Sequence, residues 1–414
     1  MATQKGYKAS ELGIIPQDWD VVELGSVGEP IIGLTYSPRD INNNGVLVLR
    51  SSNIHSNKLA FDNNVFVKME IPERVIVKEN DILICVRNGS RQLIGKCALI
   101  TKEAEGFAFG AFMSVFRTPF APFVFYAFQS DKMQSQIKEI MGATINQITN
   151  KDLREFKIAI PKSTAEQTAI ATALSDTDTL IDSLQTLIAK KQAIKLSAMQ
   201  NLLSGKIRLP EFAQHPDGSP KTTRQTELGC VPEDWEVVEL GNVVNIFDNL
   251  RIPVTASKRI SGSTPYYGAN GIQDYVEGFT HKGEFVLIAE DGANDLINYP
   301  VSYVNGEIWV NNHAHVVQGK ENVLDNRFLA YRLNSTNITS YLVGGTRAKL
   351  NGSTLKIIQI IIPKSTDEQT AIAQLLSDMD AEIEALECRL KKTQSLKQGM
   401  MQALLTGKIR LPLE

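Results

Sequence analysis

The sequence has few of the residues that mark several common protein classes. It contains only four cysteines and no CxxC pair, which predicts a reduced, cytoplasmic protein whose thiols are small core residues. It has no apolar run of about 18 residues and no apolar signal core, so we expect no contact with a membrane. Its charge is almost balanced, with 43 Lys and Arg against 46 Asp and Glu. Any binding of nucleic acid would therefore depend on local patches or on a basic partner.

Motifs for catalysis or cofactor binding are also scarce. GSRQLIGKC at 89–97 has five residues between its glycines and ends in cysteine, so it does not match a P-loop. His313 and His315 form an HxH pair that could touch a metal, but no third ligand is evident and a structural pair is the simpler interpretation. Glu290 and Asp291 could serve a nuclease, yet the sequence shows no partner for acid–base chemistry. We therefore predict no catalytic residue, no metal and no cofactor in this chain.

A long internal duplication dominates the sequence. IPKSTAEQTAIA at 160–171 returns as IPKSTDEQTAIA at 362–373, and both copies continue to the same GKIRLP. An opening phrase is repeated as well, as ELGIIPQDWDVVELGSV at 11–27 and ELGCVPEDWEVVELGNV at 227–243. Solenoid repeats usually have 20–50 residues, whereas this unit has about 200, so the pattern indicates two duplicated domains.

Each repeated phrase predicts one long amphipathic helix. A serine followed three residues later by glutamate forms a capping box, and a later glycine offers the left-handed residue that ends a helix. Apolar residues recur between them at spacings of three and four, as in a heptad repeat. The positions expected to pair the helices are Ile170, Leu174, Ile181, Leu184, Ile188, Ile372, Leu376, Ile383, Leu386 and Leu390. We expect an antiparallel coiled coil, with packing of each helix on its own domain, or a mixture of the two, as the alternatives.

The segments between the repeated phrases differ from each other. Runs such as FVLIAE at 285–290 and IWVNNHAHVV at 308–317 predict strands, so each segment is expected to be a mixed α/β (α+β) domain. The two segments converge at their ends, GATINQITNKDL at 142–153 with GGTRAKLNGSTL at 344–355. The order of the repeats is cyclic and pseudo-two-fold, so the two ends of the chain are expected to lie near each other.

These patterns divide the chain into five parts. We predict a first domain at 1–160, a central repeated helix at 161–210, an exposed irregular linker at 211–226, a second domain at 227–362 and a C-terminal repeated helix at 363–414. The domains carry loops rich in Arg, Asn, Gln, Gly and aromatic residues. Arg suits guanine and Asn or Gln suits adenine in the major groove of DNA, but the same residues suit ordinary loops.

The whole pattern resembles the specificity (S) subunit of type I restriction–modification systems. The phrases ELG.IP..W.VVELG, IPKST.EQTAIA and Q.LL.GKIRLP carry this resemblance, each present twice, together with PYYGANGIQDYVEGF and GLTYSPRDI in the variable segments. The resemblance implies two target recognition domains, each reading one half of a bipartite, asymmetric DNA site. It also implies that the helices set the spacer between the halves and dock two modification (methyltransferase) subunits.

The resemblance further implies a division of labour among subunits. The modification subunits would bind S-adenosylmethionine and methylate adenine, and restriction subunits would use ATP and Mg to translocate and cleave DNA. This chain would recognise double-stranded DNA without catalysis. A free-standing nuclease and a protein-only scaffold remain as alternatives. The nuclease predicts metal-dependent turnover by the isolated chain, and the scaffold predicts no sequence-dependent DNA binding.

Residue type and loop placement give the candidate DNA contacts. In the first domain they are Tyr36, Arg50, Ser52, Asn53, Arg87, Asn88, Ser90, Arg91, Gln92, Asn146 and Gln147. In the second domain they are Tyr266, Tyr267, Asn270, Asp291, Asn294, Asn312, His313, Arg347 and Lys349. A local turn bond is the alternative role for Asn53, Asn270 and Asn312. A surface strand position is the alternative for Arg50 and Tyr266.

Overall fold

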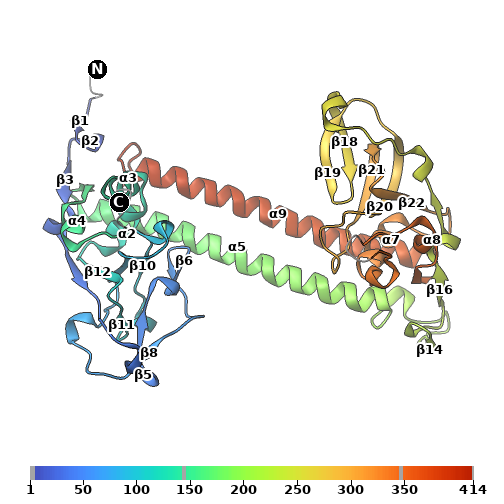
Figure 1. Ribbon diagram of the computed structural model, residues 1–414, viewed down its shortest axis with the longest axis horizontal. Helices are drawn as coiled ribbons and strands as arrows, with labels where there is room; N and C mark the ends of the chain where they lie inside the picture. The colour runs from blue at the N-terminus through green and yellow to red at the C-terminus, as the bar shows by residue number, and fades with distance from the viewer. Residues whose placement is uncertain (1–4, 142–145, 345–347, 413–414) are drawn as a thin grey trace. The chain divides into compact units, whose positions relative to one another are not determined.

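The chain folds into two compact units. The computed structural model describes residues 5–141, 146–344 and 348–412. Unit 1 comprises Met1–Gln185 and Arg389–Glu414, and unit 2 comprises Thr186–Cys388. Each unit combines one α/β domain with parts of both long helices, α5 (Thr164–Ser204) and α9 (Thr366–Leu404) (Figure 1).

The domain of unit 1 is built on two sheets in which most strand pairs are antiparallel. Its strands are β1 (Tyr7–Ser10), β2 (Gly13–Pro16), β3 (Trp19–Glu23), β4 (Glu29–Ile32), β5 (Ile41–Leu49), β6 (Ile54–His55), β7 (Lys58–Leu59), β8 (Phe66–Val67), β9 (Ile82–Cys85), β10 (Cys97–Leu99), β11 (Ala108–Phe109), β12 (Met113–Arg117) and β13 (Lys157–Pro161). Its helices are α1 (Leu24–Val27), α2 (Ala121–Gln129), α3 (Asp131–Ile140) and α4 (Asn150–Glu155). The larger sheet has the order β10-β9-β12-β4, and the smaller one β11-β5-β8.

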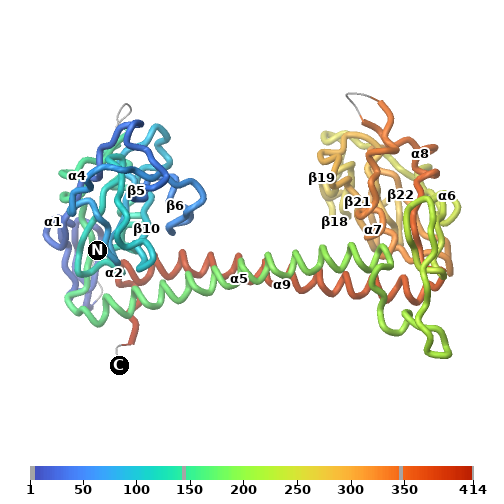
Figure 2. Tube along the Cα trace, turned by 90° about the horizontal axis from the view of Figure 1, so that it is seen from below, coloured from blue at the N-terminus to red at the C-terminus, as the bar shows by residue number. Residues whose placement is uncertain are grey.

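The domain of unit 2 contains a six-stranded sheet of order β17-β22-β20-β21-β18-β19. Its strands are β14 (Thr223–Thr226), β15 (Gly229–Pro232), β16 (Trp235–Glu239), β17 (Val244–Ile246), β18 (Ser261–Gly268), β19 (Gly271–Val276), β20 (His281–Ala289), β21 (Val301–Val310), β22 (Ala314–Gly319) and β23 (Gln359–Pro363). Its helices are α6 (Leu240–Val243), α7 (Asn326–Asn334) and α8 (Gly352–Lys356), of which α7 packs on β20, β21 and β22 (Figure 2).

One strand in each unit is buried on both faces. In β9, Ile82 and Ile84 join the apolar cluster beneath α2, whereas Leu83 and Cys85 join a second cluster on the other side. Strand β20 repeats this arrangement with its own two clusters. Side chains alternate between the faces of a strand, so two buried faces require a continuous apolar run, and DILICV and FVLIAE supply one. The loops that follow these two strands form the candidate site.

The opening phrases form the same substructure in both units. Strand β3 pairs with β13 so that Trp19 lies opposite Pro161, and β16 pairs with β23 so that Trp235 lies opposite Pro363. Both tryptophans are fully buried. The indole N–H of Trp19 donates to Glu166 at 3.3 Å, and that of Trp235 donates to Glu368 at 3.2 Å. A buried Trp needs such a partner for its N–H, which explains why a helix-start glutamate is buried in each unit.

An arginine from each GKIRLP phrase closes this substructure. Arg208 binds Asp234 at 2.7 Å and Glu368 at 2.6 Å in unit 2. In unit 1 the equivalent Arg410, from the last residues of the chain, binds Asp18 at 2.8 Å and also Glu166. The Tyr7 hydroxyl donates to the carbonyl of Gly407 at 3.0 Å in the same unit. The regions near the two ends of the chain therefore meet, as the cyclic order predicted.

The two long helices run antiparallel within each unit. In unit 1 Lys397 binds Asp178 at 2.6 Å, and the hydroxyl of Thr177 lies 3.6 Å from the sulfur of Met400. In unit 2 Lys191 binds Glu382 at 2.7 Å, and Lys195 binds Asp380. In both units, residues later in α5 contact residues earlier in α9, so the two helices run in opposite directions.

Among the helices of the described residues, none combines the length and the apolar character that a membrane span requires.

The apolar stripe of each helix has two kinds of neighbour. Ile170 and Leu174 belong to the core of the unit 1 domain, which also receives Leu404 from α9. Ile372 and Leu376 take the same place in unit 2. Leu184, Ile188 and Ile383 are also buried, whereas Ile181, Leu386 and Leu390 are only partly buried. Helix pairing and packing on the helix's own domain therefore occur together, which is the mixture that the sequence allowed.

A second shared contact holds each domain on the helices. The hydroxyl of Tyr126 donates to Asp178 at 2.9 Å, and that of Tyr331 donates to Asp380 at 2.7 Å. The two lysines that bind these aspartates also lie over the tyrosine rings, at 5.6 and 5.7 Å. Burial raises the pKa of Tyr331 to about 12 and raises that of Tyr126 further, so both hydroxyls keep their protons at neutral pH. Two unlike domains thus rest on the helices through one geometry.

Two local predictions were wrong. The linker at 211–226 was expected to be irregular, but its last residues form β14, which pairs with β15 just as β1 pairs with β2. An exposed hairpin strand needs no apolar residues, so composition did not reveal it. The run 308–317 was expected to be one strand, but β21 ends at Val310 and β22 begins at Ala314. Between them the side chain of Asn311 accepts the His313 N–H at 2.8 Å and forms a turn.

Candidate nucleic-acid interface

Three segments of unit 1 meet after strand β9. The N–H groups of Val86 and Arg87 donate to the carbonyl of Phe112 at 3.1 and 3.0 Å. The N–H of Ile148 donates to the carbonyl of Val86 at 2.8 Å, and Arg87 and Gln147 form an antiparallel bridge. We call the residues 87–92, 110–112 and 146–148 the first loop cluster. The sequence placed Arg87 and Gln147 among the DNA contacts without indicating that they are neighbours.

Polar side chains dominate the surface of the first loop cluster. The amide of Asn88 donates to the Ser51 hydroxyl at 2.9 Å, which ties the cluster to the loop after β5. The amide of Asn146 donates to the carbonyl of Gly89 at 3.4 Å. The exposed polar side chains of this cluster are those of Arg87, Ser90, Arg91, Gln92 and Asn146. The cluster therefore offers guanidinium and amide donors to an outside partner.

Unit 2 builds the equivalent surface after strand β20. The N–H of Leu350 donates to the carbonyl of Glu290 at 2.7 Å, and Asp291 and Lys349 form an antiparallel bridge. The amide of Asn270 donates to the carbonyl of Gly292 at 2.9 Å, and its oxygen accepts the N–H of Asn294 at 2.9 Å. We call the residues 268–271, 290–295, 311–313 and 348–350 the second loop cluster. His313 and the exposed Asn312 lie in its turn, where His313 contacts Asp291.

The two clusters share a backbone frame and differ in side chains. The bond from Ile148 to Val86 in unit 1 corresponds to the bond from Leu350 to Glu290 in unit 2. The segments that converge in sequence supply both donors, and they place Gln147 and Lys349 at the same position of the frame. One scaffold thus presents two chemically different surfaces.

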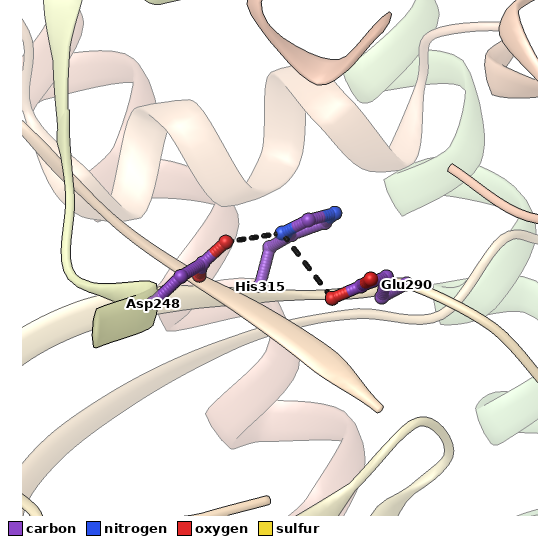
Figure 3. Close-up of side chains that lie close together, drawn as sticks. All are labelled: Asp248, Glu290 and His315. Carbon is purple, nitrogen blue, oxygen red and sulfur yellow. Dashed lines mark hydrogen bonds and ion pairs between the residues drawn. The ribbon is translucent and has the colours of Figure 1, made fainter. Parts of the chain in front are cut away.

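A buried ion-pair network underlies the second loop cluster. Nδ1 of His315 is hydrogen-bonded to Asp248 at 2.6 Å (Figure 3). Nε2 of the same ring is hydrogen-bonded to the carbonyl of Leu350 at 2.7 Å. Each ring nitrogen of His315 therefore faces an acceptor oxygen. Glu290 is bound by Arg251 at 2.7 Å and by Lys349 at 2.9 Å. The network fixes both sides of the bridge that carries Lys349.

The acidic members of this network stay ionised. Burial alone would raise the pKa of Asp248, but hydrogen bonds from His315 and from the Val316 N–H outweigh it and hold the pKa below its usual value. Burial likewise opposes ionisation of Glu290, and hydrogen bonds from Arg251 and Lys349 lower its pKa overall. Because their pKa values are low, both carboxylates are ionised at neutral pH and bind the surrounding cations.

The same three residues lie close enough to suggest a metal site. The nearest ligand atoms of Asp248, Glu290 and His315 all lie within 4.8 Å of one another. However, both nitrogens of His315 are already hydrogen-bonded to other groups, and Arg251 and Lys349 already compensate Glu290. A metal ligand must be a neutral imidazole with a free lone pair. These residues therefore fit an ion-pair network and do not fit a divalent cation.

Replacement of Asp248 by asparagine tests the network. At pH 7 we expect the free energy of unfolding to fall by about 1–3 kcal/mol, because the buried hydrogen bonds of Asp248 to His315 and to the Val316 N–H lose their charged acceptor. The pKa of Asp248 is lower in the folded state than in the unfolded state, so its ionised form stabilises the protein at pH values above the unfolded-state pKa. This contribution disappears as the pH falls through the folded-state pKa. The difference between wild type and Asp248→Asn should therefore shrink below about pH 4. Chemical denaturation at pH 7 and pH 3.5 measures it, and an equal difference at both values would contradict it.

Two candidate DNA contacts were assigned wrongly. Asn53 is fully buried, where its oxygen accepts the N–H of Arg50 at 3.0 Å and its amide donates to the carbonyl of Ala60 at 2.9 Å. Tyr266 is 1% exposed, and its hydroxyl bonds both the N–H and the carbonyl of Val254. Both side chains are satisfied inside the fold and cannot reach a base. Polar type and loop proximity had suggested otherwise, because neither reports burial.

The remaining candidates are dispersed. Tyr36 and Tyr267 pack against apolar clusters with part of the ring exposed, Ser52 is partly buried, and Arg50 is bound to the side chain of Asn63 at 3.2 Å. The guanidinium of Arg91 donates to the carbonyl of Met141. Arg347 lies outside the described residues. The sequence analysis missed Phe112, Asp248 and Arg251, which have no motif and are brought to the clusters only by the fold.

Comparisons with known proteins place these observations in context. The sequence profile of the type I restriction modification DNA specificity domain matches residues 16–193 and again 232–394. A specificity subunit predicted for a type I restriction enzyme of Haemophilus influenzae is 51% identical over 148 residues, which cover 36% of this chain and 37% of that protein. The specificity subunit of the type I restriction enzyme MjaVIII of Methanocaldococcus jannaschii is 25% identical and covers 96% of this chain and 94% of its own length. The crystal structure of an S subunit from M. genitalium has the same fold, with a TM-score of 0.64, 16% identity and 98% coverage of both chains.

Proposed function

This chain belongs to the type I restriction modification DNA specificity family, and from this membership we propose that its two loop clusters each read one half of a bipartite, asymmetric DNA site. The observation that carries the proposal is the shared backbone frame with different side chains. Identical surfaces would suit a palindrome, whereas these surfaces suit two unlike half-sites. Exposed Arg, Asn and Gln side chains offer the hydrogen bonds that distinguish guanine and adenine in the major groove.

We further propose that the long helices separate the half-sites and receive partner subunits. Each unit contains an equivalent pair of α5 and α9 segments with equivalent contacts, so the chain offers two similar helical surfaces. Two modification subunits would bind there, and restriction subunits would complete the assembly. The slight excess of acidic residues in this chain implies that such partners share the contacts to DNA phosphates.

Catalysis is assigned by this proposal to the partners. S-adenosylmethionine would bind to the modification subunits, and ATP and Mg to the restriction subunits. The strongest metal-like cluster of the described residues, at Asp248, is saturated by ion pairs. The role of this chain is therefore to select the DNA that its partners methylate or cleave.

Methylome sequencing tests the proposal directly. Cells carrying this chain with its neighbouring methyltransferase subunit should show methylated adenine in both halves of a two-part motif with a fixed unread gap. A matched strain with the methyltransferase alone should show no such motif. An assembled complex that produces no new methylation would contradict the proposal and favour a scaffold. Metal-dependent cleavage by the isolated chain would favour a nuclease.

A further inference from the structure

An exposed aromatic ring lies inside the first loop cluster. Phe112 is 57% exposed, although its backbone carbonyl is bound by two N–H groups. The adjacent backbone is fixed as well, since Gly110 donates to Leu49 at 2.9 Å, Ala111 donates to Leu34 at 2.8 Å and Met113 donates to Gly110 at 2.8 Å. A Cβ on Gly33 would lie 2.2 Å from the Gly110 carbonyl, so the two backbones pack closely here. The ring is therefore held in solvent by a rigid loop.

The guanidinium of Arg87 lies over this ring. Its central carbon is 5.3 Å from the ring centroid of Phe112, which is a cation–π distance. Arg50 and Arg91 are hydrogen-bonded to the chain, whereas among the described residues no hydrogen bond or ion pair engages the guanidinium of Arg87. This contact restrains the position of the guanidinium and leaves its N–H groups available. Among the described residues, Arg87 is thus positioned by the ring of Phe112 while its guanidinium engages no hydrogen bond or ion pair.

We propose that Arg87 and Phe112 together read one base step of the first half-site in the major groove. Arg87 donates two hydrogen bonds to O6 and N7 of a guanine, and the ring of Phe112 packs on the C5-methyl group of a neighbouring thymine. Guanine is the base that presents two adjacent acceptors in this groove, and thymine is the base that presents a methyl group. This assignment rests on the proposed function and adds the base identities.

The surroundings favour DNA over a protein partner. A protein-docking surface has a desolvated apolar centre of several side chains with a polar rim. Here Phe112 is the exposed ring of a loop cluster that also carries Asn88, Ser90, Gln92 and Asn146, whose amides and hydroxyl match base edges and phosphates. Docking of a protein on Phe112 is therefore the competing outcome that the test must detect.

Base analogues separate these outcomes. The complex of this chain with its methyltransferase subunits is titrated with a duplex carrying its own motif. Each thymine of the first half-site is replaced in turn by deoxyuridine, which lacks only the methyl group, and each guanine by 7-deazaguanine, which lacks N7. One uridine should weaken wild-type binding about fourfold, the value of one buried methyl group. One deazaguanine should weaken it about tenfold through a lost hydrogen bond. Phe112→Ala should abolish the first effect and Arg87→Ala the second.

Phe279→Ala is the matched control. Phe279 is 48% exposed, has Lys282 at 5.9 Å from its ring and lies in unit 2, so this variant should retain both effects. Specific wild-type binding that responds to no analogue would overturn the base assignment and leave the proposed function intact. Wild-type binding without sequence preference would overturn the proposed function itself. Loss of methyltransferase subunits from Phe112→Ala, with both analogue effects retained, would show a protein contact and reject the assignment.

Discussion

Replacement of residues 28–159 by the corresponding segment of another specificity subunit should change one half of the methylated motif and leave the other half and the gap unchanged. The physical reason is that the described side-chain contacts of this segment lie within unit 1. Each wrong base pair reduces binding by about 1–3 kcal/mol, so a half-site of three changed pairs would lose roughly two to six orders of magnitude in preference. Methylome sequencing of the variant measures the change.

The graft must preserve the contacts that seat a domain on the helices. Tyr126 binds Asp178, and Lys397 lies over its ring, in the same arrangement that holds Tyr331 in unit 2. A donor segment with tyrosine at this position should fold on the host helices, and a donor with phenylalanine there tests whether this contact is needed. Replacement of residues 244–361 is the matched control and should change only the other half. A change of both halves in either variant would show that the units do not read DNA independently.

Sequence reasoning reached the architecture because the repeat carries strong local signals. The hydroxyl of Ser163 accepts the Glu166 N–H at 3.4 Å at the start of the helix, and the spacing of Ile170 and Leu174 sets its apolar face. The burial of Glu166 against Trp19 was not predictable, because both residues also have ordinary surface or core roles and their pairing depends on a fold that joins positions 147 residues apart. Local sequence patterns therefore predicted the helices but not the buried contact between a helix and the opening phrase.

The candidate site was predictable only in part, for a similar reason. Arg87 and Gln147 were selected by residue type, and the fold brought them together. Asn53 and Tyr266 have the same polar character but are buried, which type alone does not reveal. Phe112 was missed because an apolar residue is expected to be inside. Residue type thus identifies chemistry that suits DNA, and only the three-dimensional arrangement decides which side chains can reach it.

Arg208→Ala should destabilise unit 2 by about 3–5 kcal/mol at neutral pH, because it leaves a buried carboxylate without its partner. The side chain of Glu368 is only 2% exposed and that of Arg208 8%. Burial already raises the pKa of Glu368 despite hydrogen bonds from Arg208 and Trp235, and loss of the arginine should raise it further. Because the pKa of Glu368 is higher in the folded state than in the unfolded state, the free energy of unfolding falls as the pH rises between these two pKa values. The loss of stability in Arg208→Ala should therefore be smaller near pH 5 than at pH 7.5.

Two companion variants identify the cause of this defect. Glu368→Gln in the Arg208→Ala background removes the charge but keeps an acceptor for the Trp235 N–H, so it should restore most of the lost stability and remove the pH dependence. Arg410→Ala is the matched change in unit 1, and it should be milder because the Arg410 side chain is 39% exposed and water can replace it. Denaturant unfolding followed by tryptophan fluorescence reports these effects, since Trp19 and Trp235 are hydrogen-bonded to the glutamates that the two arginines bind. Equal defects for both arginines, or no rescue by Glu368→Gln, would show that the loss arises from side-chain packing and not from an unpaired buried charge.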